Sequence, residues 1–173
     1  MQRALALAHE LGFEKSCTDE VGALLHVLAG QAGRRRVGEL GTGAGVAAAW
    51  MVSALDPAVP FVTVEAEPRL ADAAGGLFDA DENVRVLAGD WREAMADEGP
   101  FDLLFVDAHG AKDDADAVLR LLAPRGTAVL DDFTVGWEGP DPRRDAWLRN
   151  PALAAVEVLT TPSASAIVAV RQV

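Results

Sequence analysis

The sequence has few cysteines, few basic residues and no long apolar run. Its single cysteine, Cys17, excludes an internal disulfide and any zinc site built from several cysteines. No stretch approaches the roughly 18 apolar residues that a membrane span requires, and the opening Met1-Gln2-Arg3 does not begin a signal peptide. We therefore expect a soluble, cytoplasmic protein without a membrane partner.

Acidic residues outnumber basic ones. The chain holds 27 Asp and Glu against 15 Lys and Arg, which gives a formal net charge of −12. An acidic surface repels phosphate backbones, so we expect no nucleic-acid partner. Half of the 173 residues are apolar, which is enough for one domain with a full core. We predict a single domain over residues 1–173, in which residues 1–33 form an N-terminal helical cap segment.

Strand-like and helix-like segments alternate along the chain. The expected strands are 36–40, 61–65, 84–88, 101–106, 127–130, 155–160 and 165–171. The expected helices are 2–12, 18–32, 46–55, 68–78, 112–123 and 143–149. Only a few residues around Pro162 separate the last two strands, so this pair must be antiparallel. The alternation predicts an α/β fold.

A glycine-rich turn follows the first expected strand. Gly41, Gly43 and Gly45 stand at every second position, which lets the backbone turn tightly and approach a ligand. Glu65 ends the next strand, and an acid at that edge of a parallel sheet commonly holds a ribose diol. A Walker loop is absent, and a dinucleotide fingerprint would place Val46 at its third glycine. A turn that merely joins a strand to a helix is the alternative.

The form E-x-G-x-G-x-G over residues 39–45 resembles the first motif of class I S-adenosylmethionine-dependent methyltransferases. The resemblance implies a Rossmann-like fold, with a mostly parallel seven-stranded sheet, a C-terminal antiparallel hairpin and helices on both faces. It also implies S-adenosyl-L-methionine as cofactor. Glu39 and the three glycines then surround the methionine end, and Glu65 holds the ribose.

Two further segments match cofactor-binding positions of these enzymes. Asp90 follows the third strand and matches an acid that meets the adenine amine, while Trp91 either stacks on the purine or packs in the core. Thr18 lies in a segment, 16–22, that resembles the one closing over the cofactor in caffeoyl-coenzyme A methyltransferases. Thr18 is alternatively only a helix cap.

Three acids after the fourth and fifth strands resemble the metal ligands of the catechol and caffeoyl-coenzyme A O-methyltransferase group. They are Asp107, Asp131 and Asp132, and oxygen ligands of this kind suit Mg²⁺, Ca²⁺ or Mn²⁺. Asp132 departs from the group, which has Asn there, and the extra charge either changes the metal or marks a metal-free relative. In the alternative interpretation Asp107 contacts the cofactor and Asp131 caps a loop.

The catalytic residues are expected near Asp107. His109 is two residues further along and Lys112 five, and we rank His109 slightly above Lys112 as the general base. The loop after the fifth strand brings Phe133, Trp137 and Trp147, which either wall an aromatic acceptor or pack the loop. Arg143 and Arg144 could pair with an acceptor carboxylate, although solvated arginines are commoner.

The predicted function is methyl transfer to a small hydroxylated aromatic acceptor, with divalent-metal assistance as one version. Dihydroxybenzoates are the first choice, and a coenzyme A thioester is not expected because the chain is so acidic. The alternatives are a metal-free N- or C-methyltransferase and a non-catalytic, cofactor-binding homologue. The residue pattern does not fix the oligomeric state, for which a homodimer is one expectation.

Overall fold

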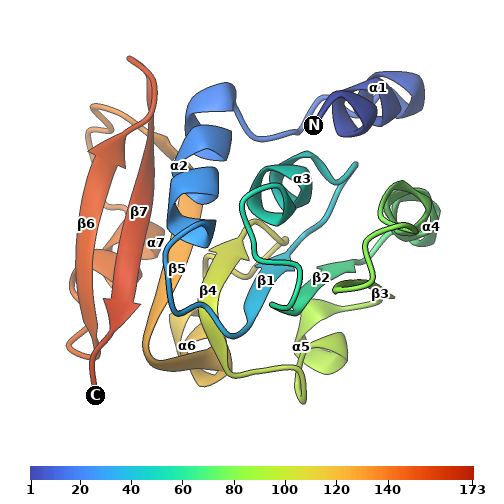
Figure 1. The fold of residues 1–173 in the computed structure, drawn as a ribbon. Coiled ribbons are helices and arrows are strands. Elements are labelled where there is room, and N and C mark those ends of the chain that lie inside the picture. Colours follow the sequence, from blue (N-terminus) through green and yellow to red (C-terminus); the bar gives the residue numbers. More distant parts are fainter.

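A computed structural model describes residues 1–173 as one sheet with helices on both faces (Figure 1). The strands are β1 Val37–Leu40, β2 Phe61–Glu65, β3 Val84–Ala88, β4 Phe101–Val106, β5 Leu122–Thr134, β6 Leu153–Leu159 and β7 Ala164–Arg171. The helices are α1 Gln2–Leu11, α2 Asp19–Ala29, α3 Val46–Val52, α4 Pro68–Leu77, α5 Trp91–Ala94, α6 Ala115–Leu121 and α7 Pro142–Leu148. None of these helices has the length and hydropathy that crossing a bilayer requires.

The seven strands follow the order β3-β2-β1-β4-β5-β7-β6. Neighbours from β3 to β5 run parallel, and β7 runs antiparallel to both β5 and β6. The predicted Rossmann-like fold with a C-terminal hairpin is therefore confirmed. The carboxyl ends of the parallel strands share one edge of the sheet, where the glycine turn and the acids lie.

Two buried clusters fill the space between the sheet and its helices. One joins α1, α2, α3 and α4 to one face of the sheet through residues such as Leu25, Met51 and Leu77. The other joins α5, α6 and α7 to the opposite face, through Trp91 and Trp147 among others. In Figure 1 the N-terminal helices accordingly lie across the sheet from α6. Both faces being covered leaves the sheet edge as the natural place for a ligand.

Strand β5 is much longer than the predicted 127–130. Pro124 and Gly126 predicted a turn before it, but the strand already pairs with β4 through Leu122. At the other end it continues to Thr134 because β7 supplies partners beyond a bulge between Leu130 and Phe133. The bulge holds Asp131 and Asp132, and Asp132 has a left-handed φ of 63°.

Most helices are shorter than predicted. Helix α2 ends at Ala29 and α3 at Val52, whereas the apolar composition continues beyond both. Helix α6 begins at Ala115, three residues later than expected, because the Asp114 carboxylate accepts a hydrogen bond from the Ala117 backbone N–H at 3.1 Å and caps it there. The residues before this cap, Lys112 among them, are thereby left in a loop that faces the strand ends.

The glycine at the end of β1 is required by the neighbouring strand. Gly41 has a φ of 94°, and a Cβ on it would lie 2.8 Å from the Ala108 backbone nitrogen. Gly33 has a similar φ of 86° but nothing within 4 Å of such a Cβ. Replacing either glycine by a residue with a side chain would therefore strain the backbone in a similar way. Only at Gly41 would the new Cβ also clash with a neighbouring segment.

We expect Gly41→Ala to destabilise the cofactor-free protein by about 1–3 kcal/mol more than Gly33→Ala, since overpacking against backbone adds to the strain of a left-handed residue. Urea unfolding of the two variants and the wild type measures the difference. Equal losses in both variants would contradict the close approach of β1 and β4.

Candidate functional site

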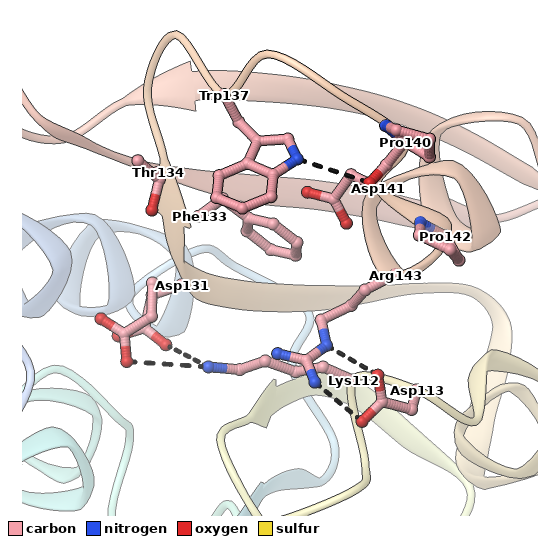
Figure 2. A pocket seen from close by; sticks show the side chains of 11 residues that line it. Lys112, Asp113, Asp131, Phe133, Thr134, Trp137, Pro140, Asp141, Pro142 and Arg143 are labelled. Atoms are coloured by element: carbon pink, nitrogen blue, oxygen red, sulfur yellow. Dashed lines mark hydrogen bonds and ion pairs between the residues drawn. The ribbon is translucent and has the colours of Figure 1, made fainter.

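Two cavities lie at the carboxyl edge of the sheet and meet at Asp132. The glycine-turn cavity has a volume of about 930 Å³ and is lined by residues 13–17, the turn after β1 and the ends of β2, β3 and β4. The β5-loop cavity has a volume of about 530 Å³ and is lined by the end of β5, the loop to α7, and Lys112 and Asp113 (Figure 2). Asp132 lines both.

Glu65 is held in place by the glycine turn. Its Oε2 accepts a hydrogen bond from the Gly43 N–H at 2.8 Å, and its Oε1 accepts one from the Glu67 N–H at 2.9 Å. Each carboxylate oxygen keeps a free lone pair for a hydroxyl group. The predicted meeting of the glycine turn and this acid at one edge is thus present in the structure.

The three glycines have different tasks. Gly41 and Gly43 line the glycine-turn cavity, and the ring of Phe13 packs so close to Gly43 that a Cβ there would lie 2.6 Å from it. Gly45 does not line the cavity. It begins α3 with a φ of 81°, and a Cβ on it would lie 2.9 Å from Leu77 Cδ2. The structure thus requires Gly45 for packing against α4, and its predicted contact with the cofactor stays a prediction.

Glu39 is a fully buried acid with one oxygen unpartnered. Its Oε2 accepts a hydrogen bond from the Thr63 hydroxyl at 2.7 Å, whereas its Oε1 has no partner. Burial raises the pKa of Glu39 well above its ordinary value, the Thr63 hydrogen bond opposes this, and repulsion from Asp107 and Glu65 adds to it. The residue lines the glycine-turn cavity, so a cationic group there would satisfy the free oxygen.

Asp90 and Trp91 both line the glycine-turn cavity. The Asp90 carboxylate accepts a hydrogen bond from the Arg92 N–H at 2.8 Å, which caps α5 and fixes the acid. Trp91 is buried in the core cluster, and the Arg92 guanidinium lies 4.5 Å from its ring centroid. Of the two interpretations of Trp91, core packing is therefore present, and Arg92 is a cavity residue that the sequence did not indicate.

Thr18 acts as a helix cap. Its hydroxyl accepts a hydrogen bond from the Val21 N–H at 3.3 Å at the start of α2, and it is not among the residues that line the cavity. Its neighbours Ser16 and Cys17 do line it. The segment 16–22 thus reaches the site through Ser16 and Cys17 rather than through Thr18.

Asp107, Asp131 and Asp132 come together as predicted, with one oxygen of each within 4.8 Å of the others. The Lys112 ammonium lies among them. Its Nζ donates to Asp107 Oδ1 at 2.7 Å and to Asp131 Oδ1 at 3.1 Å, and it lies 3.8 Å from Asp132 Oδ2. Figure 2 shows the lysine side chain running toward Asp131. We call these four residues the carboxylate–lysine cluster.

Lys112, Asp107 and Asp131 are largely buried, so their charges perturb one another. Burial raises the pKa of Asp131 to about 7, repulsion from Asp107 adds to this, and Lys112 opposes it. Burial also raises the pKa of Asp107, and attraction to Lys112 only partly opposes this shift. For Lys112, burial acts to lower the pKa, but attraction to Asp107 and Asp131 outweighs it and the net shift is upward. The lysine is therefore a firmly charged ammonium.

In donor type and spacing the three acids alone would suit a divalent cation. Lys112 changes this assessment, because a metal held by the same oxygens would occupy the space of the ammonium and carry charge of the same sign. With Lys112 in its observed position the cluster does not fit a metal ion.

His109 shares the glycine-turn cavity with Asp107 and Asp132 but, unlike Lys112, forms no hydrogen bond or ion pair with them. It is exposed and lines the glycine-turn cavity, while Lys112 lines the β5-loop cavity beside Asp131. The structure thus brings Lys112, rather than His109, to Asp107. Spacing could not show this, because five residues of loop can return a long side chain to the strand end as readily as two.

The aromatic residues of the β5 loop divide between the two interpretations. Phe133 and the largely exposed Trp137 line the β5-loop cavity (Figure 2). Trp147 is fully buried in the core, and its Nε1 donates to the Lys112 carbonyl oxygen at 2.9 Å. Trp147 therefore does not wall the cavity and instead anchors the backbone of the lysine.

Both arginines of α7 have partners within the protein. Arg143 donates to the two oxygens of Asp113 at 2.7 and 2.9 Å. Arg144 donates to Asp141 at 2.7 Å and lies 3.1 Å from Glu157. The expectation that these arginines are free to bind an acceptor carboxylate is therefore not supported.

The buried Glu39 predicts a pH effect on stability. Because its pKa in the folded state lies above the ordinary 4.5, the folded protein keeps this proton to higher pH than the unfolded chain. Stability should then fall as pH rises from 4.5 through the folded pKa. Thermal unfolding of the cofactor-free protein should show that Glu39→Gln gains stability over the wild type as pH rises. Glu82→Gln, at an exposed position, is the control. Parallel pH curves for wild type and Glu39→Gln would contradict this.

Comparison with known proteins agrees with this geometry. A family model described as a methyltransferase domain matches residues 39–133. A protein of Mycobacterium leprae with the provisional name O-methyltransferase is 33% identical over 155 residues, which is 82% of this chain and 69% of that one. A relative from Mycobacteroides abscessus with the same provisional name is 36% identical over 135 residues, covering 72% of this chain and 62% of its own. The chain therefore spans under two thirds of the length of several relatives.

Solved structures share the fold. The O-methyltransferase from Bacillus cereus, in complex with SAH, has a TM-score of 0.81 at 21% identity and covers 99% of this chain and 90% of that one. TomG from Streptomyces achromogenes, in complex with SAM, has a TM-score of 0.81 at 22% identity, covering 99% and 89%. The resemblance to class I S-adenosylmethionine-dependent methyltransferases is confirmed, and the chain belongs to the methyltransferase domain family.

Proposed function

We propose that this protein is an S-adenosylmethionine-dependent O-methyltransferase that acts on a small hydroxylated aromatic acceptor. The observation that carries the proposal is the meeting of the two cavities at Asp132. One cavity presents acids to a nucleoside with a cationic amino-acid end, and the other presents aromatic side chains beside charged groups. The provisional O-methyltransferase name of the relatives supports the reaction class.

Three acids of the glycine-turn cavity support the choice of cofactor. Glu65 faces it with a carboxylate already oriented by backbone N–H groups, as a ribose diol requires. The unpartnered oxygen of Glu39 suits the ammonium of the methionine end. Asp90, fixed at the start of α5, remains able to accept from an adenine amine. The SAH and SAM of the solved neighbours support this choice of ligand.

The reaction needs alignment and removal of one proton. When bound, the cofactor supplies a methyl group that moves in line to the acceptor oxygen, while the electron pair of the broken carbon–sulfur bond stays on sulfur. Asp131 lines the β5-loop cavity, and its pKa of about 7 suits it to accept the hydroxyl proton. Lys112 is charged and cannot accept that proton, so its part is to stabilise negative charge on the oxygen.

A divalent cation is the second candidate for the positive charge at this place. Asp107, Asp131 and Asp132 would hold Mg²⁺, Ca²⁺ or Mn²⁺ through the three oxygens that lie within 4.8 Å of one another. The ion would lower the pKa of an acceptor hydroxyl. This version requires the Lys112 side chain to leave its observed position.

The charges around the β5-loop cavity point to a neutral acceptor. Four aspartates line it against two cations, Lys112 and Arg143, and both cations are paired with acids. A carboxylate on the acceptor would therefore meet repulsion without a free partner. A volume of about 530 Å³ suits a one-ring compound. Simple catechols thus replace dihydroxybenzoates as the first compounds to assay. Coenzyme A thioesters, which carry several phosphates, remain disfavoured.

Cofactor binding is tested at Glu65. Glu65→Gln should weaken S-adenosylhomocysteine binding about 10- to 100-fold, because hydrogen bonds to a charged group contribute about 1.5–3 kcal/mol. Isothermal titration calorimetry measures the affinity, and the exposed Glu82→Gln is the matched control. Binding of NADH in place of S-adenosylhomocysteine would refute the proposal. Cofactor binding without turnover of any catechol, amine or carbon acceptor would favour the non-catalytic homologue.

Acceptor choice is tested through the Asp113–Arg143 pair. The wild type should turn over catechol with a kcat/KM at least about tenfold above that of 3,4-dihydroxybenzoate, which corresponds to about 1.4 kcal/mol of unfavourable interaction. Asp113→Asn frees Arg143 and should narrow this ratio, whereas Asp116→Asn, at an exposed position on α6, should leave it unchanged. A wild type that prefers the benzoate would show that the cavity charges do not select the acceptor.

A further inference from the structure

We propose that the Lys112 ammonium is a built-in substitute for the divalent cation, so that this enzyme transfers the methyl group without a metal and excludes metal from the cluster. The inference rests on the proposed function for the identity of the reaction, but not for the exclusion of the ion. It follows from the position, the anchoring and the hydrogen-bond capacity of one side chain.

The ammonium stands where a metal would stand. Its Nζ lies 2.7 Å from Asp107 Oδ1 and 3.1 Å from Asp131 Oδ1, and 3.8 Å from Asp132 Oδ2. A divalent ion bound to the same oxygens at about 2.0–2.6 Å would lie in contact with the ammonium. The two cations cannot share the cluster, and one must leave before the other enters.

The lysine is anchored at both ends. Its backbone carbonyl oxygen accepts a hydrogen bond from the buried Trp147 Nε1 at 2.9 Å, and the preceding Ala111 is fully buried. Its side chain is 12% exposed, and its ammonium is paired with Asp107 and Asp131. The side chain of Asp131 is only 4% exposed. Withdrawal of the ammonium would leave both acids poorly solvated and uncompensated, so the observed arrangement is self-consistent without any ion.

The ammonium also retains the capacity to act on the acceptor. An ammonium has three N–H donors, and Asp107 and Asp131 take two of them. Asp132 is beyond hydrogen-bond distance at 3.8 Å and its side chain is 76% exposed. Since Lys112 lines the β5-loop cavity, the third donor is available to an acceptor oxygen there. It would stabilise the charge that develops when the hydroxyl proton leaves for Asp131.

Asp132 is consistent with this exchange of cations. The related metal-binding group has an amide at this position, which is a neutral metal ligand. The carboxylate here adds a negative charge that the singly charged ammonium does not balance, and because the Asp132 side chain is 76% exposed, water can solvate that charge.

The test measures ion binding directly, with Mn²⁺ as the probe and electron paramagnetic resonance of free Mn²⁺ as the readout. Samples of the full chain are titrated with and without S-adenosylhomocysteine. We expect no loss of free Mn²⁺ signal for the wild type or for Arg120→Met, an exposed control with the same change of charge. Lys112→Met should bind Mn²⁺ stoichiometrically, and adding Asp131→Asn should abolish this binding.

Activity supplies a second readout. Chelator should leave wild-type turnover unchanged, and Lys112→Met without metal should lose about 10²–10³-fold in kcat, as expected for removal of a charge-stabilising donor. Stoichiometric Mn²⁺ binding by the wild type that Asp131→Asn removes would overturn the proposal. Failure of Lys112→Met and Lys112→Gln to bind Mn²⁺ would also overturn it, since the ammonium would then not be what excludes the ion. These binding results hold even if no methyl acceptor is found, so they separate this inference from the proposed function.

Discussion

Repulsion among four acids at one edge of the sheet is the constraint on which the site depends. Burial is the largest reason why the pKa of Glu39 is raised, and repulsion from Asp107, Glu65 and Asp131 raises it further. The protein offsets the repulsion differently at each acid. Glu65 receives backbone N–H groups, Glu39 receives the Thr63 hydroxyl, and the other two share the Lys112 ammonium. Among these acids, Glu39 Oε1 is the buried oxygen that has no partner, and the Ser16 hydroxyl and Trp91 Nε1 of the same cavity are also without partners.

The fold could be predicted from the sequence because it is encoded locally. A few residues are enough to indicate each main feature of the sheet. The glycine turn and the acid after the next strand indicate neighbouring parallel strands, and the short final turn indicates the antiparallel pair. The convergence of Asp107 and Asp131 was equally predictable, since parallel strands end at a common edge. The length of β5 was not, because its outer part is stabilised by pairing with β7, which lies thirty or more residues away in the chain.

Side-chain destinations were harder to predict than backbone positions. Lys112 and His109 both follow β4, and only the loop conformation before α6 decides that the lysine reaches the acids. Trp137 and Trp147 both follow β5, yet Trp137 in the loop is exposed beside a cavity and Trp147 in α7 is fully buried. The packing of Gly45 against Leu77 could not be predicted for a similar reason, because no spacing rule records which residue of α4 approaches the start of α3.

The left-handed backbone of Asp132 has an evolutionary consequence. Asn and Asp are the non-glycine residues that adopt a positive φ most readily, so exchange between them at this bulge leaves the backbone unchanged. On this proposal, substitution of Lys112, with or without an exchange at position 132, would convert an ammonium-centred site into one suited to a metal without moving a strand. A scaffold of this kind allows descendants to change the cation they depend on while the cofactor cavity is inherited intact.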